Sequence, residues 1–134
     1  QETLYYRFMS RIRRLPRKQV QDLVFINHRT DVAIVVTIPE ADGEDIIAIG
    51  SYYLDPKTNL AEVAFVVHDR WQNRGIGAFL LRHLIRIARR NGIRGFTAEV
   101  LVENKSMQAV INKSNTKVRS KVGNNVISYE MDFE

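Results

Sequence analysis

The residues best suited to chemistry in this sequence form a short glycine-rich segment, residues 72–77, with the sequence Gln-Asn-Arg-Gly-Ile-Gly. The segment follows an apolar stretch at residues 60–67 that reads as a strand, and it opens the longest predicted helix, which runs to about Arg90. A turn of this kind presents unpaired backbone N–H groups at the positive end of the helix dipole. It is therefore suited to binding an anion, and phosphate is the natural occupant.

Two nucleotide-binding motifs do not fit this segment. A dinucleotide fingerprint would need a third small residue where the sequence has Leu80, and a P-loop would need Gly-Lys-Ser/Thr, which is absent. What remains is Gln-x-x-Gly-x-Gly. Taken alone, this pattern fits an ordinary glycine-rich helix start as well as it fits a ligand site.

The elements that must position this segment are predicted from periodicity and turn residues. Two short helices open the chain, one at residues 2–12 and one after Pro16 that carries Val20, Leu23 and Val24 on one side. Strands are expected at residues 32–38 and 46–54, joined by a turn at 39–45, and a third at 60–67 that is apolar enough to be buried on both faces. Asn91-Gly92 ends the long helix, and a strand through residues 96–102, a helix at 106–113 and a strand at 126–133 follow.

Length and composition are those of one domain, residues 1–134, with 45% hydrophobic residues. The formal net charge of +5 suits an anionic ligand but decides little. The absence of cysteine excludes disulfides, thiolate metal sites and a cysteine nucleophile, and it permits a cytoplasmic location, which we expect. No apolar run approaches the roughly 20 residues of a membrane span, and Gln1 begins no signal-peptide pattern. The start lacks Met and lies inside a predicted helix, so we expect a piece of a longer, multidomain polypeptide.

Residues 60–78, Leu-Ala-Glu-Val-Ala-Phe-Val-Val-His-Asp-Arg-Trp-Gln-Asn-Arg-Gly-Ile-Gly-Ala, resemble the central signature of the GNAT superfamily of N-acetyltransferases. The resemblance extends from about Val32 to Phe133. It implies an α/β fold with a mixed, mostly antiparallel central sheet flanked by helices, and a strand, glycine loop and helix that form the acyl-CoA site. The implied activity is transfer of an acetyl or short acyl group from acetyl-CoA or another acyl-CoA to an amine, by direct attack on the thioester.

The same resemblance implies the cofactor-binding residues. Backbone N–H groups of the glycine-rich turn would hold the coenzyme A pyrophosphate, and the preceding strand would pair with the pantetheine arm. Asn104 would orient the cofactor, although an asparagine there could equally cap the following helix. The full set is Phe65, Val67, Gln72, Asn73, Arg74, Gly75, Ile76, Gly77, Ala78 and Asn104.

Glu62 is the candidate general base. A lysine amine has a pKa of about 10.4 and is protonated at pH 7, so the reaction needs a group that removes its proton. Glu62 is the one ionisable residue inside the apolar strand, and burying a lone carboxylate there is costly. The spacing alone supports equally well a glutamate that reaches solvent or pairs with an arginine, and similarity to transferases with Ala-Glu-Val-Ala favours the base. Glu99 is a second candidate, better suited to a structural role.

The sequence departs from the family pattern at two places. Counting from Asn104 puts Ile111 where many members have a tyrosine that acts as general acid, and Ser114 is the nearest hydroxyl. Asn115-Thr116 replaces the common Gly-Phe, and the fold should survive because asparagine tolerates the left-handed conformation. His28, His68 and His83 are too dispersed for a metal site, so no metal is expected.

The opening Tyr-x-Arg-Phe together with Ala-Glu-Val-Ala-Phe-Val-Val is similar to bacterial protein lysine acetyltransferases. That family's catalytic domain is often joined to an acyl-CoA-handling or nucleotide-sensing domain, so a covalently linked regulatory domain is an expected partner. The expected acceptor is a protein lysine, followed by a small-molecule amine. The alternative function is a non-catalytic acyl-CoA-binding regulatory module of a larger metabolic enzyme. Nucleic acid and membrane partners are not expected, because no matching recognition motif accompanies the positive charge.

Overall fold

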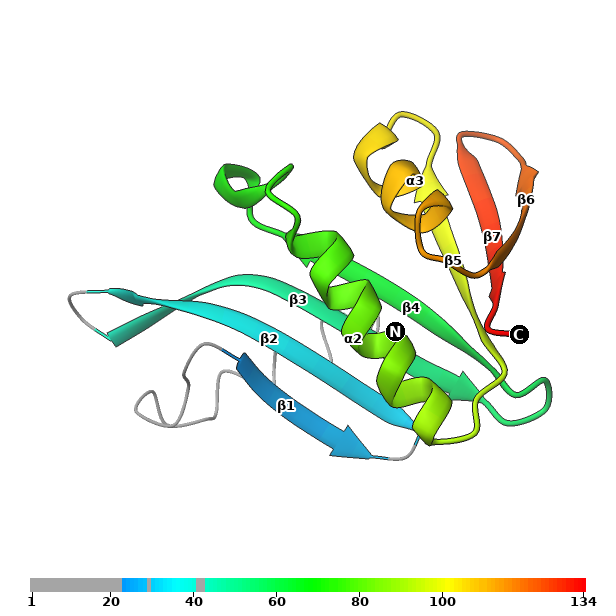
Figure 1. Cartoon of the computed structure of the whole chain (residues 1–134). Coiled ribbons are helices and arrows are strands. Elements are labelled where there is room, and N and C mark those ends of the chain that lie inside the picture. Colours follow the sequence, from blue (N-terminus) through cyan, green and yellow to red (C-terminus); the bar gives the residue numbers. More distant parts are fainter. Residues whose placement is uncertain (1–22, 29, 41–42) are drawn as a thin grey trace.

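The computed structural model describes residues 23–28, 30–40 and 43–134. Seven strands of this part form one sheet in the order β1-β2-β3-β4-β5-β7-β6. All neighbouring strands are antiparallel except β4 and β5, which are parallel, so the predicted mixed, mostly antiparallel sheet is confirmed. The elements are β1 Leu23–His28, β2 Asp31–Glu40, β3 Gly43–Asp55, β4 Leu60–Val67, the 3₁₀ turn η2 Asp69–Trp71, α2 Ile76–Arg90, β5 Gly95–Leu101, α3 Lys105–Asn112, β6 Lys117–Val122 and β7 Val126–Asp132 (Figure 1).

The second predicted helix is wrong where it reaches Leu23 and Val24. These residues begin β1, which pairs antiparallel with β2 from Leu23 opposite Val36 to His28 opposite Asp31. The segment contains β-branched and aromatic residues, and the neighbouring strand supplies partners for its backbone, so pairing overrides a helical spacing of apolar residues. The first predicted helix and the start of the second lie outside the described residues.

Strand β6 was not expected from the sequence. Its residues are mostly charged or polar and exposed, and it pairs only with β7 at the edge of the sheet. An exposed edge strand does not need the apolar alternation that marks a half-buried strand, so the pattern gave no signal.

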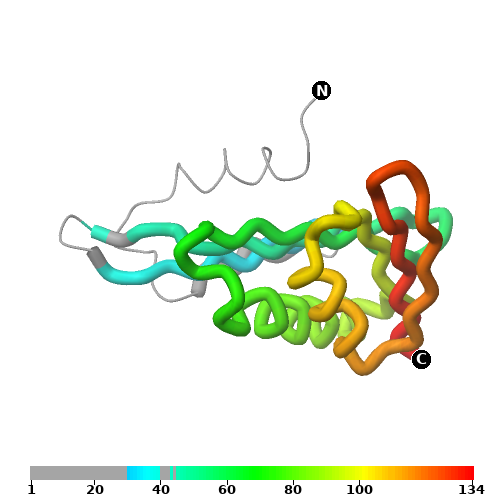
Figure 2. Tube along the Cα trace, turned by 90° about the horizontal axis from the view of Figure 1, so that it is seen from above, coloured from blue at the N-terminus to red at the C-terminus, as the bar shows by residue number. Residues whose placement is uncertain are grey.

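Helix α2 packs on one face of the sheet, against β2, β3 and β4 (Figure 2). Its buried stripe consists of Leu80, Leu81, Leu84, Ile85 and Ala88. Four arginines lie on its outer side and are all exposed: Arg82, Arg86, Arg89 and Arg90. The helix ends as predicted, with Asn91 as its cap and Gly92 in the left-handed conformation at φ 77°.

An aromatic cluster links β3 to β5 and to the residue that follows β7. The ring of Phe96 on β5 lies 5.4 Å from that of Tyr52 on β3 and 4.9 Å from that of Phe133, measured between centroids. Asn91 donates a hydrogen bond of 3.0 Å to the Tyr52 hydroxyl, which fixes the end of α2 to the sheet. Burial raises the pKa of Tyr52, so the phenol stays neutral in this cluster.

Substitution of Gly95 tests how tightly the first residues of β5 are packed. The Cβ of Gly95→Ala would meet the carbonyl oxygen of Met131 and approach a Leu60 methyl group to 3.1 Å. Because this contact involves backbone, we expect a loss of about 1–3 kcal/mol in the free energy of unfolding, measured by chemical denaturation. Gly123→Ala is the control, since its Cβ would come no closer than 3.7 Å to the Val126 carbonyl oxygen. Equal losses in the two variants would contradict the packing described here.

Candidate functional site

Strands β4 and β5 separate soon after they begin, and this separation forms the site. Only three residue pairs join them, from Leu60 opposite Gly95 to Glu62 opposite Thr97. The next amide after β4, that of His68, donates to the Ile47 carbonyl of β3 at 2.7 Å. Amide directions alternate along a strand, so the N–H groups of Phe65 and Val67 point to the opposite side, into the gap. An extended ligand can therefore pair with this edge of β4.

The turn between β4 and α2 is held by its own side chains. Gln72 donates through Nε2 to the Val67 carbonyl at 3.1 Å and to the Asp69 carboxylate at 3.3 Å. The guanidinium of Arg74 lies over the ring of Trp71, 5.0 Å from its centroid. These contacts fix the turn without using the backbone amides that follow it.

Those amides form a row of free donors at the start of α2. The N–H groups of residues 73–78 donate no hydrogen bond within the described part of the chain, whereas the Phe79 N–H donates to the Gly75 carbonyl at 3.0 Å. The Gln72 N–H is different, because it donates weakly to the Asp69 carbonyl at 3.4 Å. No side chain caps the helix and no acidic residue stands in its first turn. The helix end is thus equipped to bind an anion.

A cavity of about 720 Å³ lies beside these donors, within the size range of small-molecule sites. It brings together eight of the ten residues predicted to bind a cofactor: Phe65, Val67, Gln72, Asn73, Gly75, Gly77, Ala78 and Asn104. Two do not line it. The Arg74 side chain stacks on Trp71 instead, and Ile76 is half-buried against the core.

The sequence did not point to the residues that line the far side of this cavity. They come mainly from α3 and include Lys105, Ser106, Met107, Ala109 and Val110, together with Trp71 of the turn. The Ser106 hydroxyl donates a hydrogen bond to the Asn73 side chain, which ties α3 to the glycine-rich turn. A short helix was predicted here, but its periodicity could not tell which face would meet the turn.

Asn104 has the capping role that the sequence left open. Its side-chain oxygen accepts a hydrogen bond of 3.1 Å from the Met107 N–H at the start of α3. The residue also lines the 720 Å³ cavity, so its position suits both a cap and a ligand contact.

Glu62 is exposed, and the prediction that its strand is buried on both faces is wrong. On β4, Ala61 and Val63 face the core, whereas Glu62 and Val66 are open on the other face. Neither the carboxylate of Glu62 nor that of Glu99 forms a hydrogen bond or an ion pair with the described residues. The carboxylate is therefore not isolated in an apolar interior, and the desolvation argument for its role does not hold.

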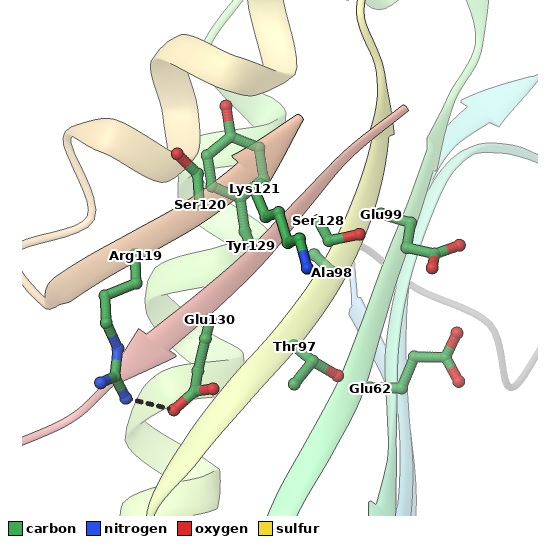
Figure 3. Close-up of a pocket in the computed structure, with 10 residues that line it drawn as sticks. All are labelled: Glu62, Thr97, Ala98, Glu99, Arg119, Ser120, Lys121, Ser128, Tyr129 and Glu130. Atoms are coloured by element: carbon green, nitrogen blue, oxygen red, sulfur yellow. Dashed lines mark hydrogen bonds and ion pairs between the residues drawn. The ribbon is translucent and has the colours of Figure 1, made fainter. Parts of the chain in front are cut away.

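Two further cavities meet at these carboxylates. One, of about 350 Å³, occupies the gap between β4 and β5 and includes Met107 and Ile111 in its lining. The other, of about 600 Å³, lies on the open face and extends over β5, β7 and β6 (Figure 3). Glu62 and Glu99 line both cavities. They thus stand between the gap and the open face.

The two departures from the family pattern have clear structural outcomes. Ile111 is fully buried and lines the gap, so no acid stands at that position. Ser114 shares a hydrogen bond of 2.8 Å with Thr116 and lines a different cavity, between α2 and α3. Asn115 adopts the left-handed conformation at φ 64°, as expected.

The histidines are separate in the part of the chain that the structure describes. Burial lowers the pKa of His83, and the positive charges of Arg86 and Arg82 lower it further. The His28 side chain lies outside the described residues. Among those that are described, no three His, Cys, Asp or Glu residues come together in a group able to hold a metal ion. The described helices include none with the length and apolar character of a membrane span.

Removal of the Asn104 side chain tests its capping role. We expect Asn104→Ala to lower the free energy of unfolding by about 1 kcal/mol, because the Met107 N–H loses its acceptor. Asn104→Ser should retain most of the stability, since serine also caps helices. Asn112→Ala makes the same chemical change at the other, exposed end of α3 and should cost less. If Asn104→Ala unfolds at the same denaturant concentration as the unmodified chain, the cap contributes nothing.

The sequence of this chain is similar to those of known acetyltransferases. The model of the acetyltransferase (GNAT) family matches residues 4–115. Acetyltransferase Pat of Mycolicibacterium smegmatis is 34% identical over 113 residues, which make up 84% of this chain and 33% of that protein. An acetyltransferase of Pseudomonas aeruginosa is 31% identical over 107 residues, or 79% of this chain and 57% of that protein. The chain spans about a third of the first relative and little more than half of the second.

Solved structures agree with the fold. The GNAT domain of S. lividans PAT superimposes with a TM-score of 0.67 at 31% identity, covering 89% of this chain and 70% of that one. A cAMP-binding acyltransferase from Mycobacterium smegmatis gives a TM-score of 0.66 at 31% identity, covering 81% of this chain and 33% of that one. The predicted fold class is confirmed.

Proposed function

The chain belongs to the acetyltransferase (GNAT) family, and we propose that it transfers an acetyl or other short acyl group from acyl-CoA to the side-chain amine of a protein lysine. One observation carries the proposal. A row of unpaired amides at the start of α2 stands beside a cavity that continues toward the open edge of β4. This arrangement offers donors for a diphosphate and, next to them, a strand edge for an amide-containing arm.

Binding of the acyl donor uses these two features in sequence. The free N–H groups of residues 73–78 hold the pyrophosphate, with Gly75 and Gly77 allowing close approach because they lack Cβ atoms. The amides of the pantetheine arm pair with the β4 edge at Phe65 and Val67. Arg74 contributes its backbone amide alone, since its side chain is engaged with Trp71.

The chemistry then takes place where the gap meets the open face. Glu62 removes the proton from the acceptor amine, directly or through water, and the amine nitrogen attacks the thioester carbonyl. A C–N bond forms, the C–S bond breaks, and a backbone N–H on the gap side of β4 stabilises the oxyanion. The thiolate leaves without a side-chain acid, because Ile111 occupies that position. Exposure of Glu62 lets it pass the proton to solvent after each turnover.

A protein lysine is the acceptor that the surroundings of Glu62 favour. The carboxylate opens on a broad cavity that crosses three strands, and a long lysine side chain on a large partner can reach it from that face. The relative from Mycolicibacterium smegmatis is an acetyltransferase named Pat, and the solved S. lividans structure is the GNAT domain of a protein with the same name, so both support transfer of an acetyl group.

Replacement of Glu62 tests the chemical step. We expect Glu62→Gln to lower kcat by roughly 10²–10⁴-fold, because the amide cannot accept the proton, while the Kd for acetyl-CoA stays unchanged. Thiol release from acetyl-CoA with lysine-bearing proteins and with small amines measures the rate, and calorimetry measures binding. Glu103→Gln is the matched control, since Glu103 is exposed and lines none of the three cavities around the gap. Tight binding without turnover in the unmodified chain would instead identify a non-catalytic acyl-CoA-binding module.

Two glycines with similar positive φ angles test the anion site. Gly75 (φ 85°) and Gly92 (φ 77°) flank α2, and a Cβ on either would meet no atom within 4 Å. Alanine at either position should therefore cost a similar 1–2 kcal/mol or so of stability from backbone strain alone. Only Gly75→Ala should also weaken acetyl-CoA binding, by about tenfold, because it crowds the donors. Equal Kd values for the two variants would argue against a pyrophosphate at this turn.

A further inference from the structure

The open face of the sheet carries charges that the proposed chemistry does not use. On edge strand β6, Lys117, Arg119 and Lys121 alternate along the strand and therefore project to one face. This basic strip, as we call these three residues, stands opposite Asp132, Glu130 and Ser128 of β7. Arg119 and Lys121 line the same 600 Å³ cavity as Glu62 and Glu99.

Strand register places the two kinds of charge at opposite ends of this cavity. One row runs from Glu62 through Thr97 and Glu130 to Arg119, across β4, β5, β7 and β6. A second row runs from Glu99 through Ser128 to Lys121. In Figure 3 the carboxylates of Glu62 and Glu99 lie together on one side of the pocket, and the Arg119–Glu130 pair lies on the other.

The charges at both ends remain available to a ligand. Arg119 pairs with Glu130 at 2.7 Å, yet 71% of its side chain is exposed. Lys121 reaches from β6 toward the pocket, and neither it nor Lys117 forms an ion pair within the described residues (Figure 3). A ligand that crosses the pocket would therefore meet two free carboxylates and then at least one free ammonium group.

We propose that this face binds an extended segment of the acceptor protein, with the target lysine at Glu62 and Glu99 and acidic residues of the same segment at Lys121 and Arg119. The inference rests on the proposed function and names its substrate more closely. The target would be a lysine flanked by aspartate or glutamate on one side.

The sheet sets the spacing between that lysine and its acidic neighbours. Strands lie about 4.8 Å apart, so Lys121 is roughly 10 Å from Glu99 and Arg119 roughly 14 Å from Glu62. An extended peptide advances about 3.3 Å per residue, which places the acidic residues about three or four positions from the lysine. Basic residues at the same positions would be repelled.

Short peptides with one central lysine test this spacing on the unmodified chain with acetyl-CoA. One set carries Asp and Glu about three and four positions before or after the lysine. A second set carries Asn and Gln at those positions, and a third carries Arg, which is basic but adds no second lysine. We expect kcat/KM to be roughly three- to tenfold higher for one acidic arrangement than for its neutral counterpart, mainly through KM, with the preference shrinking as salt is added.

A charge reversal separates docking from chemistry. Lys121→Glu should remove the acidic preference and favour the basic peptides, while the rate with a small free amine stays unchanged. Lys57→Glu changes the net charge equally at the exposed turn between β3 and β4 and should leave the preference intact. If the unmodified chain acetylates all peptides alike, or if the two variants behave alike, the docking inference fails while the proposed function stands. If neither the peptides nor the small amine are acetylated by acetyl-CoA, both the docking inference and the proposed function fail.

Discussion

Three residue pairs hold β4 and β5 together, and the rest of the site depends on this short contact. Beyond it, the facing strand edges keep amide and carbonyl groups without a strand partner, and such groups must find water or a ligand because leaving them unpaired is costly. The cluster of Tyr52, Phe96 and Phe133 closes the sheet at the paired end. Helix α2 covers one face, and α3 contacts α2 beside the gap. The described sheet is thus interrupted between β4 and β5, whereas its other neighbouring strands pair over most of their length.

The two ends of α2 are stabilised in different ways. Its buried leucines fix the helix on the sheet, and Asn91 ties its last turn to Tyr52. Its first turn has no side-chain cap, so the stabilisation that a cap would give there is absent. The turn before it is held instead by Gln72 and by the stacking of Arg74 on Trp71. These contacts hold the turn without using the N–H groups of residues 73–78, which donate no hydrogen bond within the described part of the chain.

The sequence predicts those parts of this structure whose stabilisation is local. Strands β2 to β4, helix α2 and the turn at residues 72–77 carry their own periodicity and turn residues, and they were predicted with shifts of a few residues. Strands β1 and β6 depend on pairing with a neighbour, which sequence periodicity does not record. The exposure of Glu62 was missed for a related reason, since apolar residues on both sides of it do not show whether a second layer covers the sheet. Likewise, the face of α3 that lines the cavity follows from the Ser106–Asn73 contact, between residues far apart in sequence.

The basic strip on β6 has a second physical effect, because β6 is the last strand on its side of the described sheet. Such an edge leaves half of its backbone groups free to pair with another chain, and exposed Val122 would favour that association. Lys117, Arg119 and Lys121 would meet like charges if a second copy added its own β6 to this edge, and the repulsion opposes growth of the sheet from one molecule to the next. The same three cations thereby help the protein to resist aggregation through an edge that its fold leaves open.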